Sequence, residues 1–302
     1  MKRAIVTGAT GFIGRFAVRA LLARGYEVHA LSRTASGGEQ GVHSHRVDLI
    51  AGHDVERVLK DVQATHLLHL AWCAEPPSYW ISPENLKWVQ ASLGLLDRFW
   101  ETGGQRVVAA GTCAEYDWSY GYCVENVTPT NPTSLYGVSK DCAQRLQGAY
   151  CVQRGLSSAW GRVFHLYGPG EHSARLVPTL IAGLLQGQAV PCSHGNQIRD
   201  YLHVSDVASA FAALLDSEVQ GPVNIGSGRP LLLRNLIGKV AEIIGRDDLV
   251  RLGALPSPEH EPHVLIASTE RLEKEVSWKP AFEIDQGIAD TVARWRENQR
   301  PR

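Results

Sequence analysis

Three glycines that follow a short apolar run constrain this chain more than any other segment. Ala4-Ile5-Val6 leads into Thr7-Gly8-Ala9-Thr10-Gly11-Phe12-Ile13-Gly14, and a stretch with helical periodicity comes next. Glycines between a strand and a helix permit a tight turn, a close approach of the backbone to a pyrophosphate and tight packing of the helix on the sheet. We therefore predict a dinucleotide site, contacted by Gly8, Thr10, Gly11, Phe12, Ile13 and Gly14.

Charge and cysteine usage exclude several other classes. The 302 residues carry 30 Lys or Arg against 31 Asp or Glu, a net charge of −1, so no global field favours nucleic acid or an anionic membrane. No apolar run approaches the length of a membrane span, and no signal peptide is expected. The six cysteines are far apart without a C-x-x-C pair, which is typical of a reducing compartment. We expect a cytoplasmic protein without a metal centre.

Strand-like and helical segments alternate through the first half of the chain. This alternation predicts βαβ units, and thus an α/β fold with a Rossmann-type, doubly wound parallel sheet over residues 1–170. Residues 171–302 are predicted to form a smaller α/β part that builds the substrate side, with some chain returning to the sheet. Predicted strands are 4–6, 27–32, 45–49, 65–71, 106–111 and 158–164; predicted helices are 12–24, 55–62, 85–102, 135–154, 176–185, 207–215, 235–244 and 286–298.

The end of the second predicted strand indicates which dinucleotide is bound. A carboxylate there would accept hydrogen bonds from the ribose hydroxyls of NAD. The chain instead has Ser32-Arg33, with no carboxylate before Glu39. A hydroxyl and a guanidinium suit a 2′-phosphate, so NADP(H) is favoured over NAD.

A tyrosine and a lysine share one face of a predicted helix. Tyr136 and Lys140 are four residues apart, and the ammonium is expected to lower the pKa of the phenol. Such a phenol can exchange a proton with an oxygen that alternates between carbonyl and alcohol. Thr112 follows a predicted parallel strand, at the sheet edge where ligands bind, and can polarise the same oxygen.

Together these segments resemble the extended short-chain dehydrogenase/reductases that modify nucleotide sugars. The resemblance assigns catalysis to Thr112, Tyr136 and Lys140. It also implies that Asp48-Leu49 contacts adenine and that Leu70-Ala71, after His69, lies along the cofactor.

Two longer runs resemble the substrate side of the same family. Residues 162–170 (RVFHLYGPG) are similar to its R-x-F-N-x-Y-G-P-G run, with His165 in place of the asparagine. Residues 196–206 (NQIRDYLHVSD) are similar to its R-D-[FY]-x-H-V-x-D signature, whose arginine, here Arg199, contacts a nucleotide diphosphate. Asp200 and His203 could brace the loop, and Asp206 could cap the following helix.

The departures from the family pattern narrow the reaction. Sugar 4,6-dehydratases carry Asp and Glu directly after the catalytic threonine, whereas this chain has Cys113 and Ala114. Neither side chain replaces a carboxylic acid, so dehydration is disfavoured. Cys113 and His165 remain candidates for substrate contact, each with a structural role as the alternative.

The loop that is expected to bind the substrate diphosphate also departs from the family pattern. The second diphosphate-binding arginine of the family is missing from residues 259–263 (EHEPH), and Arg175 is a candidate substitute. The aromatic segment 72–80 could frame the sugar.

The predicted activity is NADPH-dependent reduction of a keto group on a nucleotide-linked deoxysugar, with a 4-keto-6-deoxyhexose as the expected substrate. A 4-epimerase with retained cofactor is the first alternative, and a non-catalytic dinucleotide-binding sensor or scaffold is the second. The family resemblance also implies a homodimer, whose interface could use Trp88, Leu95, Phe99 and Trp100.

Overall fold

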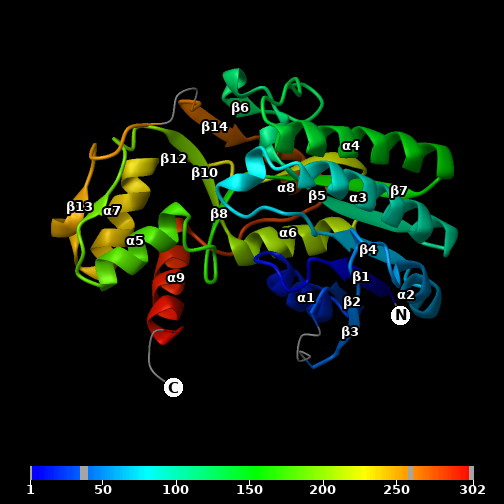
Figure 1. The fold of residues 1–302 in the computed structure, drawn as a ribbon. Coiled ribbons are helices and arrows are strands. Elements are labelled where there is room, and N and C mark those ends of the chain that lie inside the picture. Colours follow the sequence, from blue (N-terminus) through cyan, green and yellow to red (C-terminus); the bar gives the residue numbers. More distant parts are fainter. Residues whose placement is uncertain (1, 35–39, 258–260, 299–302) are drawn as a thin grey trace.

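A seven-stranded parallel sheet forms the centre of the computed structural model (Figure 1). The structure describes residues 2–34, 40–257 and 261–298. The strand order is β11-β7-β5-β4-β1-β2-β3, so the chain reverses direction across the sheet at β1. This order confirms the predicted doubly wound α/β fold. The strands are β1 (Arg3–Thr7), β2 (Glu27–Ser32), β3 (Val42–Arg46), β4 (His66–His69), β5 (Arg106–Thr112), β7 (Ser157–Val163) and β11 (Gly221–Ile225).

Helices cover both faces of this sheet because nearly every central strand is apolar on both sides. One face packs against α1 (Gly14–Ala23) and α6 (Val204–Asp216). The other packs against α2 (Val55–Val62), α3 (Glu84–Glu101) and α4 (Leu135–Arg154) (Figure 1). The parallel strands all end at one edge of the sheet, and this edge lies between the two helical layers. α/β sheets bind their ligands at the edge formed by the carboxyl ends of the strands.

A second, smaller set of elements lies beside this end of the sheet. Its sheet has the order β12-β10-β14-β6, and β8 pairs with β10. Three helices surround a separate apolar core beside it (Figure 1). The elements are β6 (Tyr122–Cys123), β8 (His165–Tyr167), β10 (Ile198–His203), β12 (Pro230–Leu232), β14 (Val264–Ala267), the pair β9 (Val190–Pro191) and β13 (Val250–Arg251), and the helices α5 (Leu176–Leu185), α7 (Leu233–Ile244) and α9 (Ile284–Asn298). The short helix α8 (Glu270–Lys274) packs instead beside β11 of the main sheet.

Several predicted boundaries differ from the structure by a few residues, and three of the differences have a local reason. β3 is Val42–Arg46 rather than 45–49, because the polar edge strand pairs with β2 in the register His29↔His43. α1 begins at Gly14 rather than at residue 12, because the preceding residues belong to the glycine turn. α6 begins at Val204 rather than 207, because His203 caps it.

Two buried carboxylates hold the smaller set of elements in place. Asp200 accepts hydrogen bonds from the backbone N–H groups of Ser227 (2.6 Å), Gly228 (2.9 Å) and Ala267 (3.1 Å), which confirms its bracing role. Asp206 accepts from two backbone N–H groups of the loop before α9, at 3.0 Å each. The expectation that Asp206 caps its own helix is therefore wrong.

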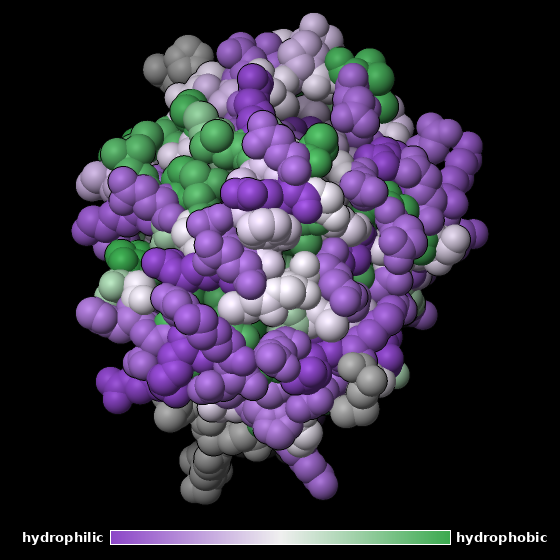
Figure 2. All heavy atoms as spheres, turned by 90° about the vertical axis from the view of Figure 1, so that its right-hand side faces the viewer, coloured by the Kyte–Doolittle hydropathy of each residue, from purple (hydrophilic) through white to green (hydrophobic). Residues whose placement is uncertain are grey.

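The surface of α3 also differs from the prediction. Leu95 and Phe99 are buried in the core, while Trp88 and Trp100 are partly buried. Exposed apolar side chains on α3 and α4 are instead Leu86, Val138, Leu146 and Val152. Figure 2 shows hydrophobic atoms gathered in the upper part of the face it views, among mostly hydrophilic ones. Within the described residues, no helix has both the length and the apolar composition needed to cross a membrane.

We predict that Asp200→Ala lowers the free energy of unfolding by about 3 kcal/mol, because it leaves one buried and two partly buried N–H donors without an acceptor. Urea unfolding followed by circular dichroism measures this change. Asp247→Ala, at an exposed site, is the matched control and should change stability by less than about 0.5 kcal/mol. Equal stability of the two variants would refute the bracing role of Asp200.

Candidate active site

The glycine turn leaves no room for side chains between β1, β4 and α1. The Gly11 N–H donates to the Gly8 carbonyl (2.9 Å), and a Cβ on Gly14 would lie 2.0 Å from that same oxygen. Gly8 has φ of +67°, and its Cβ would meet the Ala71 nitrogen at 2.8 Å. No side chain caps α1 at Ile13, and the Arg15 and Phe16 N–H groups donate to the Gly11 (3.3 Å) and Ile13 (3.1 Å) carbonyls. An anion at this helix end would therefore meet the amides that precede Arg15. These residues fit the pyrophosphate of a dinucleotide.

The end of β4 is fixed against this turn by Thr7. The Thr7 hydroxyl oxygen accepts from the Ala71 N–H (3.2 Å) and hydrogen-bonds His69 Nδ1 (2.7 Å). The other imidazole nitrogen hydrogen-bonds the Ser92 hydroxyl (2.8 Å), and the Leu70 N–H donates to the Thr7 carbonyl (3.2 Å). The structure thus places Leu70 and Ala71 beside the glycine turn, and their contact with the cofactor stays a prediction.

The residues predicted for the adenosine end lie at the ends of β2 and β3. The Ser32 carbonyl accepts from the Val47 N–H (2.8 Å), which brings Ser32 next to the chain that leads to Asp48. Arg33 is exposed. The Asp48 carboxylate accepts from the backbone N–H groups of the two residues after Leu49 (3.0 and 3.1 Å), so it orders its own turn.

Thr112, Tyr136 and Lys140 come together at the carboxyl end of β5. Thr112 is the last residue of that strand, and its side chain lies close enough to the phenol of Tyr136 to lower the pKa of that phenol, against the larger raising effect of burial. Lys140 Nζ donates to the Ala110 carbonyl of the same strand (2.8 Å). Ser134 caps α4 through the Gly137 N–H (3.1 Å), which fixes where the helix begins and thus where the phenol lies.

Burial shifts the two titrating groups in opposite directions. It raises the pKa of Tyr136 above the normal phenol value, and the neighbouring phenol of Tyr79 adds to the shift. Burial lowers the pKa of Lys140 to about 7, against a smaller raising effect of Glu115. The expectation that the lysine lowers the pKa of Tyr136 is therefore wrong for this arrangement. The ammonium instead faces the Ala110 carbonyl and the ring of Trp72, whose centroid is 3.8 Å away.

A fully buried carboxylate holds the backbone beside the catalytic threonine. Glu115 accepts from the Thr112 N–H (2.8 Å), the Trp160 indole (3.0 Å) and Arg162 Nε (2.6 Å). Burial raises the pKa of the Cys113 thiol to about 12, which keeps that thiol protonated. Residues 113–115, which follow Thr112, are Cys, Ala and Glu. Their one carboxyl group is that of Glu115, which is ion-paired with Arg162.

Aromatic residues of the segment 72–80 form a wall beside the phenol. Tyr79 meets the Tyr136 ring edge-on at 4.9 Å and Trp80 does so at 5.7 Å. Trp72 is fixed by a hydrogen bond from its indole to Asn85 (2.8 Å). The wall therefore surrounds the phenol of Tyr136, and its role in framing a sugar ring stays a prediction.

The predicted substrate residues form a polar cluster at β8 and β10. The rings of His165 and Tyr201 lie 5.4 Å apart, and burial, with Arg199 and Arg175 nearby, lowers the pKa of His165 to about 3. Arg199 is buried and donates to Glu261 (2.8 Å). The Arg199 guanidinium is thus ion-paired in this structure, and its contact with a nucleotide diphosphate, expected from the signature, stays a prediction.

Arg175 lies close to Tyr79, one of the aromatic residues beside Tyr136. Its guanidinium is 5.3 Å from the centroid of the Tyr79 ring, which itself touches Tyr136. Burial raises the pKa of the neighbouring Glu171 to about 8.

Arg15 was missed in the sequence analysis. It directly follows Gly14, its guanidinium donates to the Pro169 carbonyl, and its Nε has no hydrogen-bond partner. The sequence does indicate Arg15, because a cation in the first turn of the helix that follows the glycines lies where an anion would bind.

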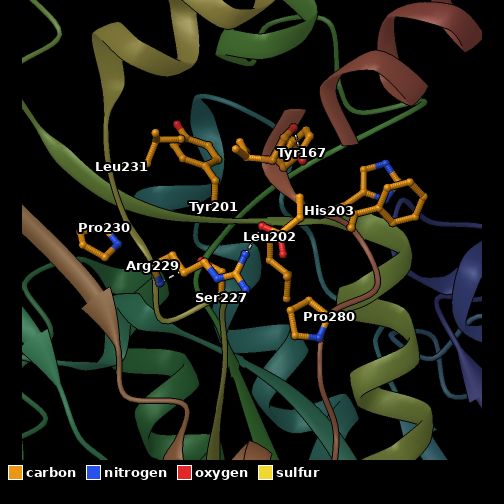
Figure 3. A pocket seen from close by; sticks show the side chains of 12 residues that line it. Tyr167, Tyr201, Leu202, His203, Ser227, Arg229, Pro230, Leu231 and Pro280 are labelled. Carbon is orange, nitrogen blue, oxygen red and sulfur yellow. Dashed lines mark hydrogen bonds and ion pairs between the residues drawn. The ribbon is translucent and has the colours of Figure 1, made fainter. Parts of the chain in front are cut away.

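A separate small cavity lies between β10 and the loop before α9 (Figure 3). Tyr167, Tyr201 and His203 line one side, and Ser227, Arg229 and Pro280 line the other. Its volume of about 130 Å³ is too small for a nucleotide sugar. None of the three predicted catalytic residues lines it.

The fold and this site define a class of nucleotide-dependent enzymes with a Thr-Tyr-Lys set at the edge of a doubly wound sheet. The chain belongs to the NAD dependent epimerase/dehydratase family, whose model matches residues 4–226. Its relatives include extended short-chain enzymes that epimerise, decarboxylate or dehydrate nucleotide sugars.

Two relatives and one further solved structure illustrate the similarity. A UDP-glucuronic acid decarboxylase of Xenopus tropicalis is 25% identical over 98% of this chain and 72% of its own. A UDP-glucose 4-epimerase of Thermus thermophilus, solved with NAD, is 29% identical with a TM-score of 0.85, over 97% and 99% of the chains. A UDP-N-acetylglucosamine 4-epimerase of Methanobrevibacter ruminantium, at 22% identity and a TM-score of 0.89 over 99% of each chain, shares the fold.

We predict that Lys140→Met stabilises the cofactor-free protein and that the gain depends on pH. The folded pKa of Lys140 is about 7, against 10.5 for a free lysine, so the unfolded chain binds more protons between these values. The cost of burying Lys140 is complete below pH 7 and fades as pH rises toward 10.5. Thermal unfolding should show a larger rise in Tm for Lys140→Met at pH 6.5 than at pH 9.5; a constant difference would contradict the assigned cause.

Proposed function

We propose that this chain is an NADPH-dependent reductase of a keto group on a nucleotide-linked deoxysugar, with a 4-keto-6-deoxyhexose as the expected substrate. The observation that carries the proposal is the set of Thr112, Tyr136 and Lys140, followed by a protonated thiol and a methyl group at positions 113 and 114. This set can move a proton to or from a sugar oxygen. It lacks the carboxyl groups that the expulsion of water requires.

The protonation state of Tyr136 supports reduction. A reductase needs a protonated phenol at the start of its cycle, whereas a reaction that begins with oxidation needs a base. Burial raises the pKa of Tyr136, so the phenol keeps its proton at neutral pH. A protonated phenol at neutral pH, as in an ordinary tyrosine, can act as the acid that reduction requires.

Each catalytic side chain then has one task. When bound, the reduced cofactor supplies the hydride, and the glycine turn with Leu70 and Ala71 would hold it. Thr112 donates a hydrogen bond that polarises the keto oxygen, and Tyr136 protonates that oxygen as it becomes an alcohol. Lys140 would hold the nicotinamide ribose and return a proton to Tyr136.

A 4-epimerase is the second candidate, because UDP-glucose 4-epimerases are among the relatives. It would use the same residues with a retained cofactor and no net oxidation. Co-purification of tightly bound NAD, together with interconversion of sugar epimers, would favour it. Homodimerisation through α3 and α4, and a cytoplasmic location, stay predictions.

We predict that Tyr136→Phe lowers kcat at least about 100-fold, because the proton donor is lost while the ring remains. NADPH binding, followed by the fluorescence of the bound nicotinamide, should change little. Tyr120→Phe, at a tyrosine that is 57% exposed, is the matched control and should keep full activity. If Tyr136→Phe leaves every activity intact, the non-catalytic sensor or scaffold becomes the better account.

Cofactor choice gives a separate prediction. Arg33→Ala should lower kcat/KM for NADPH about 10- to 100-fold, because charge-assisted hydrogen bonds to the 2′-phosphate are worth about 1.5–3 kcal/mol. Activity with NADH, which lacks that phosphate, serves as the internal control and should change less than about 3-fold. An equal loss with both cofactors would contradict the assignment of NADP(H).

A further inference from the structure

Four side chains that can bind a metal gather far from the catalytic residues, on neighbouring strands. Glu27 and His29 lie on β2, and His43 and His45 lie on β3. His29 is directly opposite His43 in the parallel register. Residues two apart on a strand share a face, so all four project from the same side of the sheet. One ligand atom each from Glu27, His29 and His43 lie within 4.8 Å of one another.

The spacing of these atoms fits one small cation. His29 Nε2 lies 3.2 Å from Glu27 Oε1, and His43 Nε2 lies 3.7 Å from the same oxygen. Two ligands of a tetrahedral zinc ion, with bonds of about 2.0–2.1 Å, are roughly 3.3 Å apart. The two distances to Glu27 Oε1 are therefore within a few tenths of an ångström of those in a zinc site.

The fourth residue orients the buried histidine. His29 Nδ1 hydrogen-bonds His45 Nε2 (2.9 Å), which leaves His29 Nε2 on the side of Glu27. A metal-binding histidine commonly has its second ring nitrogen held in this way, because the hydrogen bond fixes the tautomer and the ring plane.

The orientation of the two histidine rings determines which side chain must move before a metal ion can bind. The rings of His29 and His43 are stacked, with centroids 4.7 Å apart and planes 19° from parallel, so one ring must turn before both lone pairs converge. His43 can turn because its side chain is 58% exposed on an edge strand, whereas His29 is held in the interior.

We propose that Glu27, His29 and His43 bind a divalent transition-metal ion, with Zn²⁺ as the best match and water as the fourth ligand. Two imidazoles and one carboxylate select zinc and its neighbours over the all-oxygen preference of Mg²⁺ and Ca²⁺. The proposal departs from the expectation of no metal centre, which rested on the cysteine pattern. In the sequence, the H-x-H spacing of His43, a proposed ligand, and His45, which orients His29, is the pattern that indicates such a site.

The bound ion would join the edge strand β3 to β2. β3 buries little of its own surface, and its continuation leads to Asp48, at the predicted adenosine end of the cofactor site. A metal bridge is therefore expected to stabilise this side of the sheet while leaving the catalytic residues untouched.

The test uses untagged, chelator-treated and dialysed protein, titrated with ZnCl₂ in a calorimeter and heated with and without Zn²⁺. We expect one ion per chain and a rise in Tm. His43→Gln should lower the affinity at least 10-fold and abolish the rise. His53→Gln, at another exposed histidine, is the matched control and should behave as wild type. Zinc binding and a rise in Tm that survive in His43→Gln would overturn the proposal.

Two further measurements separate the proposed site from other ways of binding zinc. Glu27→Gln should weaken binding as His43→Gln does, and His45→Gln should alter the visible absorption of bound Co²⁺ by releasing the His29 ring. Sedimentation velocity should show the same oligomeric state with and without Zn²⁺. Zinc-dependent association that is lost in His43→Gln would place the ion between two chains and refute the intramolecular bridge.

Discussion

The active site depends on one buried carboxylate that the solvent cannot reach. Glu115 accepts from the backbone at Thr112, from Trp160 and from Arg162, and all three donors lie on β5 or β7. A buried carboxylate remains charged only when its lone pairs are satisfied in this way. The ion pair therefore fixes the turn after β5, and with it the hydroxyl of Thr112. The same negative charge favours the protonated form of the buried Lys140.

Burial of the remaining groups then sets their protonation states. The aromatic wall of Tyr79 and Trp80 surrounds the phenol of Tyr136, and desolvation keeps that phenol protonated. The same desolvation makes Lys140 costly to fold as a cation. Burying the charged lysine lowers the free energy of unfolding, so Lys140 is expected to destabilise the cofactor-free protein. Functional sites commonly reduce stability in this way.

The sequence predicted the doubly wound sheet and most of its elements, because glycine spacing and apolar periodicity are local signals. It also predicted that Thr112, Tyr136 and Lys140 belong to one site, and the structure brings them together. It could not predict the pKa shift of Tyr136 or the neutralisation of Arg199 by Glu261, because both depend on contacts between distant segments. The cofactor and substrate assignments remain predictions.

The central claim is tested most directly by incubating the protein with NADPH and a nucleotide-linked 4-keto-6-deoxyhexose. The loss of NADPH absorbance is followed while the sugar product is identified by NMR. The account predicts that one NADPH is oxidised for each 4-keto group converted to an alcohol, and that Tyr136→Phe removes both signals together. Interconversion of 4-hydroxy epimers without net consumption of NADPH would contradict it and identify the protein as an epimerase.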